Sequence, residues 1–147
     1  MTLVQVRAAV NALALLSAVE LALRATSFTT VARWCGAQVT SGEHALMSEP
    51  DAPVLSEPQR ARLRAIASAA RRWPLGPPGG CLRHCLAAAY VLRRHGPYIR
   101  LSVSTDSESV LRAHAWLEIA GAAITDPAAS GFQLRQPPRA CPGGDID

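Results

Sequence analysis

The chain has 147 residues, of which 49% are hydrophobic and 18% charged, a composition typical of one globular domain and not of a disordered chain. The net charge is +4, and every basic residue is Arg. These arginines are scattered and are not interleaved with aromatic residues, which argues against nucleic acid as a partner. The cysteine spacing is not that of a disulfide-bonded secreted mini-protein, so we expect reduced thiols and a cytoplasmic location. The four cysteines are Cys35, Cys81, Cys85 and Cys141.

The N-terminal segment, residues 1–38, is predicted to be helical, with one helix over residues 5–24 and a short second piece over 29–35. Ala8 to Val19 carries no charge and follows Arg7, as in the core of a signal peptide. However, the basic region is weak, no small-x-small site precedes a plausible mature start, and the run is shorter than the roughly 20 residues that span a bilayer. A helix of the protein core, either buried on several sides or amphipathic, is therefore favoured, and docking on a membrane surface stays open as the alternative.

Residues 39–55 contain turn-forming residues without a clean period and are interpreted as a linker or loop. Ser56 begins the next helix, because Ser-Glu-Pro-Gln places a cap residue, an acid and a proline in the order that helix starts prefer. Pro74 ends this helix, and the Pro- and Gly-rich residues 75–80 form a loop. A central helix then begins at Cys81 and ends at Gly96, the expected C-terminal cap.

The hydrophobic period changes after the central helix, which predicts strands. Residues 99–104 and 113–119 alternate apolar and polar side chains, and Ala120-Gly121 is a turn before a third strand over residues 122–126. A short fourth strand is predicted around residues 132–134, and residues 136–147 form a flexible tail. The expected fold class is α+β: N-terminal helices, and a core over residues 56–135 whose Cys-bearing central helix packs on an antiparallel sheet.

Cys81, His114 and Asp126 are the candidate catalytic residues. Free backbone N–H groups at a helix start stabilise a thiolate, which makes Cys81 a candidate nucleophile and its own N–H a candidate oxyanion donor. His114 lies on the predicted second strand, and a turn centred on Ala120 sets Asp126 opposite His114. A carboxylate there would fix the imidazole tautomer and stabilise the imidazolium, giving a nucleophile, a base and a residue that orients the base.

Structural interpretations of the same residues stay open. A Cys on a core helix is most often inert packing, which we expect of Cys85, and a lone His on a strand is usually structural. Cys81, His84 and Cys85 also form a C-x-x-H-C pattern, with His114 as a fourth candidate metal ligand. Zinc sites usually bring two such pairs together, and the chain has one. Three other titratable residues are expected to be solvated surface residues without a role: His44, His95 and Glu118.

Three motifs resemble a known family: CLRHCLAAAYVLRRHG on the central helix, AHAWLEIAG on the second strand and ITDP on the third. They are similar to those of the transglutaminase-like leader peptidases of lasso-peptide biosynthesis, in the form that is split from its leader-recognition protein. The resemblance covers roughly residues 56–134. It implies a transglutaminase-like, papain-like core, with the nucleophile at Cys81, the base at His114 and the third member at Asp126.

The activity that this resemblance implies is removal of the leader from a ribosomally synthesised precursor peptide. The expected partners are the precursor peptide, a small leader-recognition protein that pairs with the leader as an added strand, and a separate ATP-dependent lasso cyclase. Residues 76–80 lack the Lys and Ser/Thr of a phosphate-binding loop, so no nucleotide, other cofactor or metal is predicted for this chain. Two alternatives stay open: another transglutaminase-like acyl transferase, and a non-catalytic scaffold or metal-binding protein.

Overall fold

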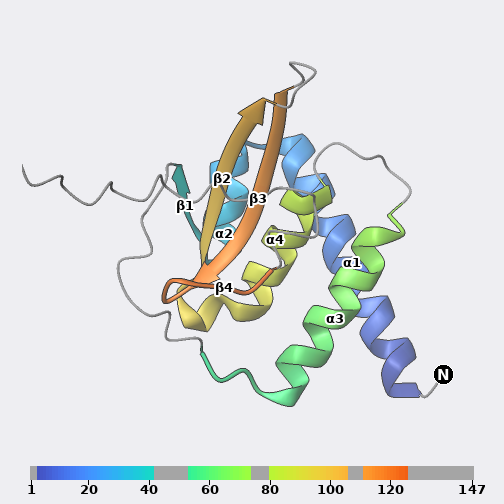
Figure 1. The fold of residues 1–147 in the computed structure, drawn as a ribbon. Coiled ribbons are helices and arrows are strands. Elements are labelled where there is room, and N and C mark those ends of the chain that lie inside the picture. Colours follow the sequence, from blue (N-terminus) through green and yellow to red (C-terminus); the bar gives the residue numbers. More distant parts are fainter. Residues whose placement is uncertain (1–2, 42–52, 74–79, 106–110, 126–147) are drawn as a thin grey trace, which may run out of the picture.

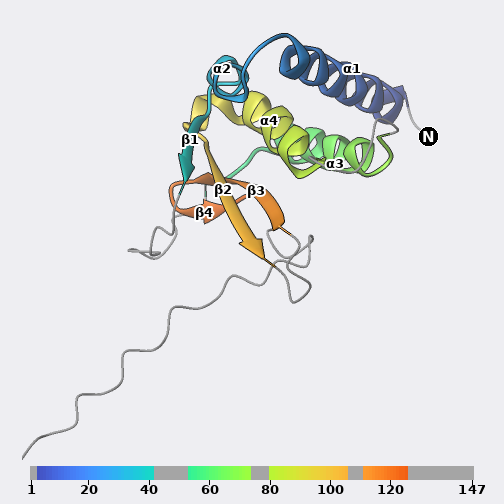
Figure 2. The same cartoon turned by 90° about the horizontal axis from the view of Figure 1, so that it is seen from above.

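The computed structural model describes residues 3–41, 53–73, 80–105 and 111–125, which form a layer of helices against a sheet (Figure 1, Figure 2). This arrangement confirms the predicted α+β fold class. The helices are α1 (Leu3–Ala25), α2 (Phe28–Trp34), α3 (Glu57–Arg71) and α4 (Gly80–Leu92), with the 3₁₀ turn η1 (Arg93–His95) after α4. The strands are β1 (Gln38–Ser41), β2 (Tyr98–Thr105), β3 (Leu111–Ile119) and β4 (Ala122–Ala123).

The sheet has the strand order β1-β2-β3-β4. Strands β2, β3 and β4 are antiparallel as predicted, whereas β1 runs parallel to β2 and makes the sheet mixed. The structure therefore corrects the start of the segment interpreted as a loop, residues 39–55, since a strand covers Gln38–Ser41. This strand has one large apolar side chain, Val39, in four residues. Such a run is too short to show the period of a strand, and its pairing comes from β2, nearly 60 residues away in the sequence.

Gly36 forms the turn that connects α2 to β1. Its φ is +76°, and a Cβ at this position would lie 2.7 Å from the Cβ of Arg93 in η1. Only glycine therefore fits without displacing the neighbouring backbone. Two residues later, the N–H of Gln38 donates to the carbonyl of Pro97 at 3.1 Å, which begins the parallel pairing with β2.

Helix α1 matches the helix predicted over residues 5–24 but is not buried on several sides. Its inner face, formed by Ala12, Leu16 and Val19, is buried in the contact with α3 and α4. Its outer face leaves Val10 58% and Leu13 46% exposed. Of the two predicted forms, a helix buried on several sides and an amphipathic helix with one buried face, the structure shows the second, because the described helices pack on α1 from one side and the sheet lies beyond α4 (Figure 2).

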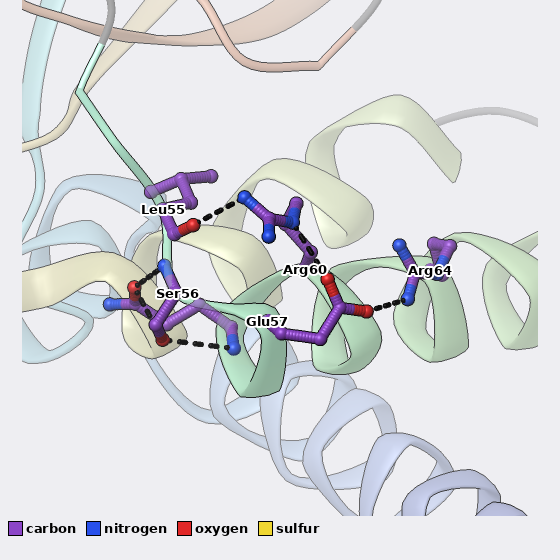
Figure 3. A network of polar contacts seen from close by, with 6 residues as sticks. Leu55, Ser56, Glu57, Arg60 and Arg64 are labelled. Carbon is purple, nitrogen blue, oxygen red and sulfur yellow. Dashed lines mark hydrogen bonds and ion pairs between the residues drawn. The ribbon is translucent and has the colours of Figure 1, made fainter.

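The start of α3 confirms the predicted cap at Ser56 (Figure 3). The backbone N–H of Ser56 donates to Gln59 Oε1 at 2.9 Å, and the N–H of Gln59 donates back to Ser56 Oγ at 3.4 Å. Glu57 adds two exposed ion pairs, with Arg60 at 2.9 Å and Arg64 at 2.6 Å. This capping box satisfies N–H groups that have no partner inside the helix. Gln59 also contacts His95 of η1, with Nε2 atoms 2.9 Å apart, so His95 is half-buried and not the solvated residue that was predicted.

Helix α4 forms the centre of the core. It contacts the three other helices on one side and β2 and β3 on the other. Its residues from Leu86 to Ala89, together with Leu92, have no exposed surface. After η1, Gly96 adopts the left-handed conformation, with φ 61° and ψ 57°, which confirms the predicted C-terminal cap.

The hairpin of β3 and β4 turns through Ala120 and Gly121, which have φ values of 49° and 79°. Two positive φ values are the mark of a two-residue turn that pairs Ile119 with Ala122. The register is therefore shifted by one residue from the prediction, because the turn has two central residues instead of one. The structure assigns β4 to Ala122–Ala123 alone, while the strand predicted around residues 132–134 and the tail over 136–147 lie outside the described residues.

Candidate active site

Cys81 is the second residue of α4, as the sequence predicted for a nucleophile at a helix start. Its thiol is free and partly buried, and its side chain packs against the edge of the core. The first turn of an α-helix has backbone N–H groups without intrahelical acceptors, and the helix dipole places partial positive charge there. The start of α4 therefore places Cys81 beside backbone N–H groups that can donate to a negatively charged group.

Cys85 lies one helical turn after Cys81 and anchors α4 to the edge of β3. Its Sγ is 3.3 Å from the carbonyl oxygen of Ala115 and 3.8 Å from Oγ1 of Thr125. Oγ1 of Thr125 in turn accepts a hydrogen bond of 2.8 Å from the backbone N–H of Leu117. Side chains thus take the places of backbone partners where β4 has ended, and they hold the helix against β3 beside Ala115.

The direction of α4 brings its start toward the first half of β3. The C-terminal end of α4 leads through η1 into Tyr98, which pairs with Glu118 near the end of β3. The helix and β3 therefore run in the same direction (Figure 1). The four residues from Cys81 to Cys85 span about 6 Å of helix, and the same length of β3 covers about two residues before Ala115. This places the Cys81 end of α4 along the first half of β3, where Ala115 and Leu117 face the helix, and His114 lies on the opposite face of the strand with Trp116.

The ring of His114 is held on β3 by a stacking contact. His114 is 6% exposed, and its ring lies 5.9 Å from the centre of the Trp116 ring at an interplanar angle of 19°. Burial lowers the pKa of His114 below its usual value of about 6.5. The imidazole is therefore neutral near pH 7, which is the protonation state that accepts a proton from a thiol.

Glu118 and Arg100 extend this contact into a row of side chains on the same face of the sheet. Nε1 of Trp116 donates to Oε1 of Glu118 at 2.7 Å, and Nε of Arg100 donates to Oε2 of Glu118 at 2.8 Å. The Glu118 and Arg100 side chains are only 13% and 14% exposed. The prediction that Glu118 is a solvated surface residue is therefore wrong.

Arg100 was not predicted as a residue of the site, although the pairing of the two predicted strands could have placed it beside Trp116. It faces Trp116 in the register of β2 and β3, and this register follows from pairing two strands of alternating pattern. The indole is thus fixed by Glu118 on its own strand, and Glu118 by Arg100 on the next. We define Arg100, Trp116 and Glu118 as the His114 support row, since they hold the surface on which the imidazole lies.

Asp126 lies outside the described residues, so its role as the residue that orients His114 stays a prediction. The residue before it is placed: Thr125 is 8% exposed and lies at Cys85 and Leu117. Thr125 therefore lies at Cys85, one helical turn after Cys81.

Within the described ranges, no three His, Cys, Asp or Glu side chains are arranged to hold a metal ion. For two members of the C-x-x-H-C pattern, Cys85 and His84, burial shifts the pKa. Burial raises the pKa of Cys85 to about 12, which keeps its thiol protonated and unreactive. Burial, with a contribution from Arg71, lowers the pKa of His84.

A small cavity lies next to the start of α4. Its volume is about 20 Å³, room for one water molecule and too little for a peptide side chain. Two buried donors on its lining, Nε1 of Trp73 and Nη1 of Arg83, have no acceptor among the described residues. A water there would accept from both. The cavity therefore explains two buried donors but does not supply a substrate pocket.

A family model described as the transglutaminase-like superfamily matches residues 3–135. The chain belongs to the transglutaminase-like superfamily. The match includes α1 and α2 as well as the segment that carries the three motifs. No curated protein and no solved structure matches the chain significantly. Membership agrees with a Cys at the start of the central helix followed by a His on an antiparallel strand, which is the arrangement that the motifs of this superfamily predicted.

Proposed function

We propose that the chain is a cysteine peptidase that removes the leader from a ribosomally synthesised precursor peptide in lasso-peptide maturation. The observation that carries the proposal is the free thiol of Cys81 at the start of α4, in a chain whose strand β3 holds a buried, neutral His114. Superfamily membership supports acyl-transfer chemistry at these residues. The finer assignment to lasso-peptide maturation rests on the resemblance of three motifs.

The proposed reaction proceeds through a thioester. His114 takes the proton of the Cys81 thiol, and the thiolate attacks the scissile carbonyl carbon. The backbone N–H of Cys81 donates to the developing oxyanion. The C–N bond breaks as His114 returns the proton to the leaving amine, which is the new N-terminus of the core peptide. Water, deprotonated by His114, then hydrolyses the thioester, and the leader departs with a free carboxylate.

The support row and Asp126 would serve His114 from different sides. The stacked indole of Trp116 limits rotation of the imidazole, because Glu118 and Arg100 fix the indole in place. Asp126, in its proposed role, would accept from the second ring nitrogen and stabilise the imidazolium that forms during the attack. Loss of either support would lower the rate without removing the nucleophile.

The proposed partners follow from the same resemblance. They are the precursor peptide, a small leader-recognition protein that adds the leader to its own sheet, and the lasso cyclase that takes the freed amine. A cytoplasmic site of action is proposed with them, where thiols such as Cys81 stay reduced. If the chain alone bound leader peptide as tightly as it does together with the leader-recognition protein, that protein would have no part in leader binding.

The test is cleavage of the precursor peptide by the chain with its recognition protein, followed by mass spectrometry of both fragments. Wild type is expected to release a leader with a free carboxylate, and Cys81→Ala to release none. Cys85→Ser is the matched control, a Cys substitution one helical turn away that is expected to keep activity if the fold survives. His114→Ala should lower the rate by about 10²-fold or more.

The alternatives predict other products. An excess of a primary amine would appear as an amide on the leader if the chain were an acyl transferase of the cross-linking kind. Activity that survives in Cys81→Ala, or zinc in near one-to-one ratio with the purified protein, would instead favour the scaffold or metal-binding alternative.

A further inference from the structure

The outer face of α1 is an apolar surface that no described element covers. Its large side chains recur at intervals of three, four and eight residues, and they extend over about 27 Å of helix. Trp34 at the end of α2, 64% exposed, adds an aromatic side chain. We call the following six residues the α1 face, with their exposed fractions: Leu3 90%, Val6 42%, Val10 58%, Leu13 46%, Leu21 67% and Trp34 64%.

The charge around the α1 face has one sign. Arg7 and Arg24 on α1 and Arg33 on α2 are exposed. The one acid within α1 and α2 is Glu20, which is buried and paired with Arg24 at 2.9 Å and with Arg83 of α4. These two pairings hold the pKa of Glu20 below its usual range. No exposed acid therefore offsets the arginines that border the apolar side chains on α1 and α2.

The neighbouring helix α3 extends the positive charge. Its exposed basic side chains are Arg60, Arg62, Arg64 and Arg71, followed by Arg72 at its C-terminal cap. Glu57 is its one acid, and two of these arginines pair with it. The helical layer thus presents apolar side chains bordered by more arginines than acids, which is complementary to a surface with an apolar interior and an anionic outer layer.

We propose that the α1 face docks the protein on the surface of an anionic membrane. The apolar side chains would enter the boundary between headgroups and acyl chains, Trp34 would lie at headgroup depth, and Arg7, Arg24 and Arg33 would meet the lipid phosphates. An apolar protein surface bordered by acids would be the competing occupant, and binding to lipid vesicles in the absence of any other protein separates the two. Figure 2 shows α1 on the side of the helical layer that faces away from the sheet, so docking through α1 would leave the sheet on the side away from the membrane.

The docked helix lies on the membrane and does not cross it. Residues 5–25 of α1 are long and apolar enough to span a bilayer by length and composition. However, the inner face of the helix is packed through Leu16 and Val19, and Glu20 is paired with Arg83 of α4. A spanning orientation would break this packing and carry the Glu20 carboxylate into the bilayer without Arg83.

The test is co-sedimentation of the full chain with vesicles of phosphatidylcholine alone or with 30 mol% phosphatidylserine, the probe lipid. Wild type is expected to pellet with the anionic vesicles, to pellet much less with neutral ones, and to be released by 1 M salt. Each arginine near the surface contributes about fivefold to partitioning. The variant Val10→Glu/Leu13→Glu should lose about tenfold or more, because two apolar side chains no longer enter the lipid.

Val54→Glu is the matched control, since Val54 is 93% exposed and lies outside α1 and α2. It should bind vesicles like wild type, and circular dichroism of all three proteins should show equal folding. The proposal is overturned if wild type does not pellet with anionic vesicles, or if the double variant pellets equally well. It is also overturned if light scattering shows a wild-type dimer that the double variant converts to a monomer, because the α1 face would then cover a second copy. Resistance to salt and carbonate extraction would indicate a spanning helix instead.

Discussion

The His114 support row gives a prediction whose magnitude follows from its hydrogen bonds. The two carboxylate oxygens of Glu118 accept from two different donors, Trp116 Nε1 at 2.7 Å and Arg100 Nε at 2.8 Å. Glu118→Gln keeps the size and shape of the side chain but leaves one oxygen, so one donor must face an amide N–H. Loss of one hydrogen bond to a charged group costs about 1.5–3 kcal/mol. The leftover charge of Arg100, only 14% exposed, adds to this cost, so we expect a loss of about 2–4 kcal/mol in the free energy of unfolding.

The assay is urea unfolding at pH 7.5, compared with the matched variant Glu57→Gln. Glu57 also accepts from two arginines, but at an exposed surface, so its substitution should leave the free energy of unfolding within experimental error. The reasoning predicts in addition that Glu118→Gln slows acylation of Cys81, because a loosened Trp116 no longer holds the His114 ring. Equal free energies of unfolding for Glu118→Gln and Glu57→Gln would show that the buried contacts of Glu118 in the His114 support row contribute no more to stability than the exposed ion pairs of Glu57.

Three further predictions concern the backbone and the histidines. Gly36→Ala should lower the free energy of unfolding by about 2 kcal/mol in urea unfolding, because φ is +76° and the new Cβ would meet Arg93; an unchanged midpoint would contradict this. Ala120→Asn should raise stability by about 1 kcal/mol in the same assay, since Asn tolerates the φ of 49° better; a loss would contradict the turn assignment. Burial lowers the pKa of His114 and His84, so the unfolded chain binds more protons than the folded chain below about pH 6.5. The free energy of unfolding should therefore fall from pH 7.5 to pH 5.5 in urea unfolding, and it should fall less in His84→Gln. A free energy of unfolding that does not change with pH would contradict this.

Local sequence rules were enough for the elements that are stabilised by their own residues. Ser56 and Gln59 cap α3 within one turn, and Gly96 ends the central helix because its conformation is a local property. The pairing of β2 and β3 follows from two alternating runs close together in the chain. The start of α4 at Gly80, next to Cys81, was also a local inference, because it follows a loop rich in Pro and Gly.

Features that depend on distant parts of the chain were not predictable in the same way. Strand β1 exists because β2 offers it an edge, and nothing in its four residues indicates that edge. The exposure of the outer side of α1 depends on which elements pack against it, whereas its composition suggested burial on several sides. Glu118 looked like a surface residue until the register placed Arg100 beside its strand. The turn at Ala120 and Gly121 pairs Ile119 with Ala122, one residue from the register expected for a turn centred on Ala120 alone, and the position of Asp126 stays a prediction.

The most direct test of the account is the rate at which iodoacetamide labels each cysteine near neutral pH, mapped by mass spectrometry in wild type and His114→Ala. Cys85 serves as an internal standard, because its thiol is 1% exposed with a pKa of about 12, and it should label slowly in both proteins. The account predicts fast labelling at Cys81 in wild type and clearly slower labelling at Cys81 in His114→Ala. Equal, slow labelling of Cys81 and Cys85 in both proteins would contradict an activated thiol at the start of α4.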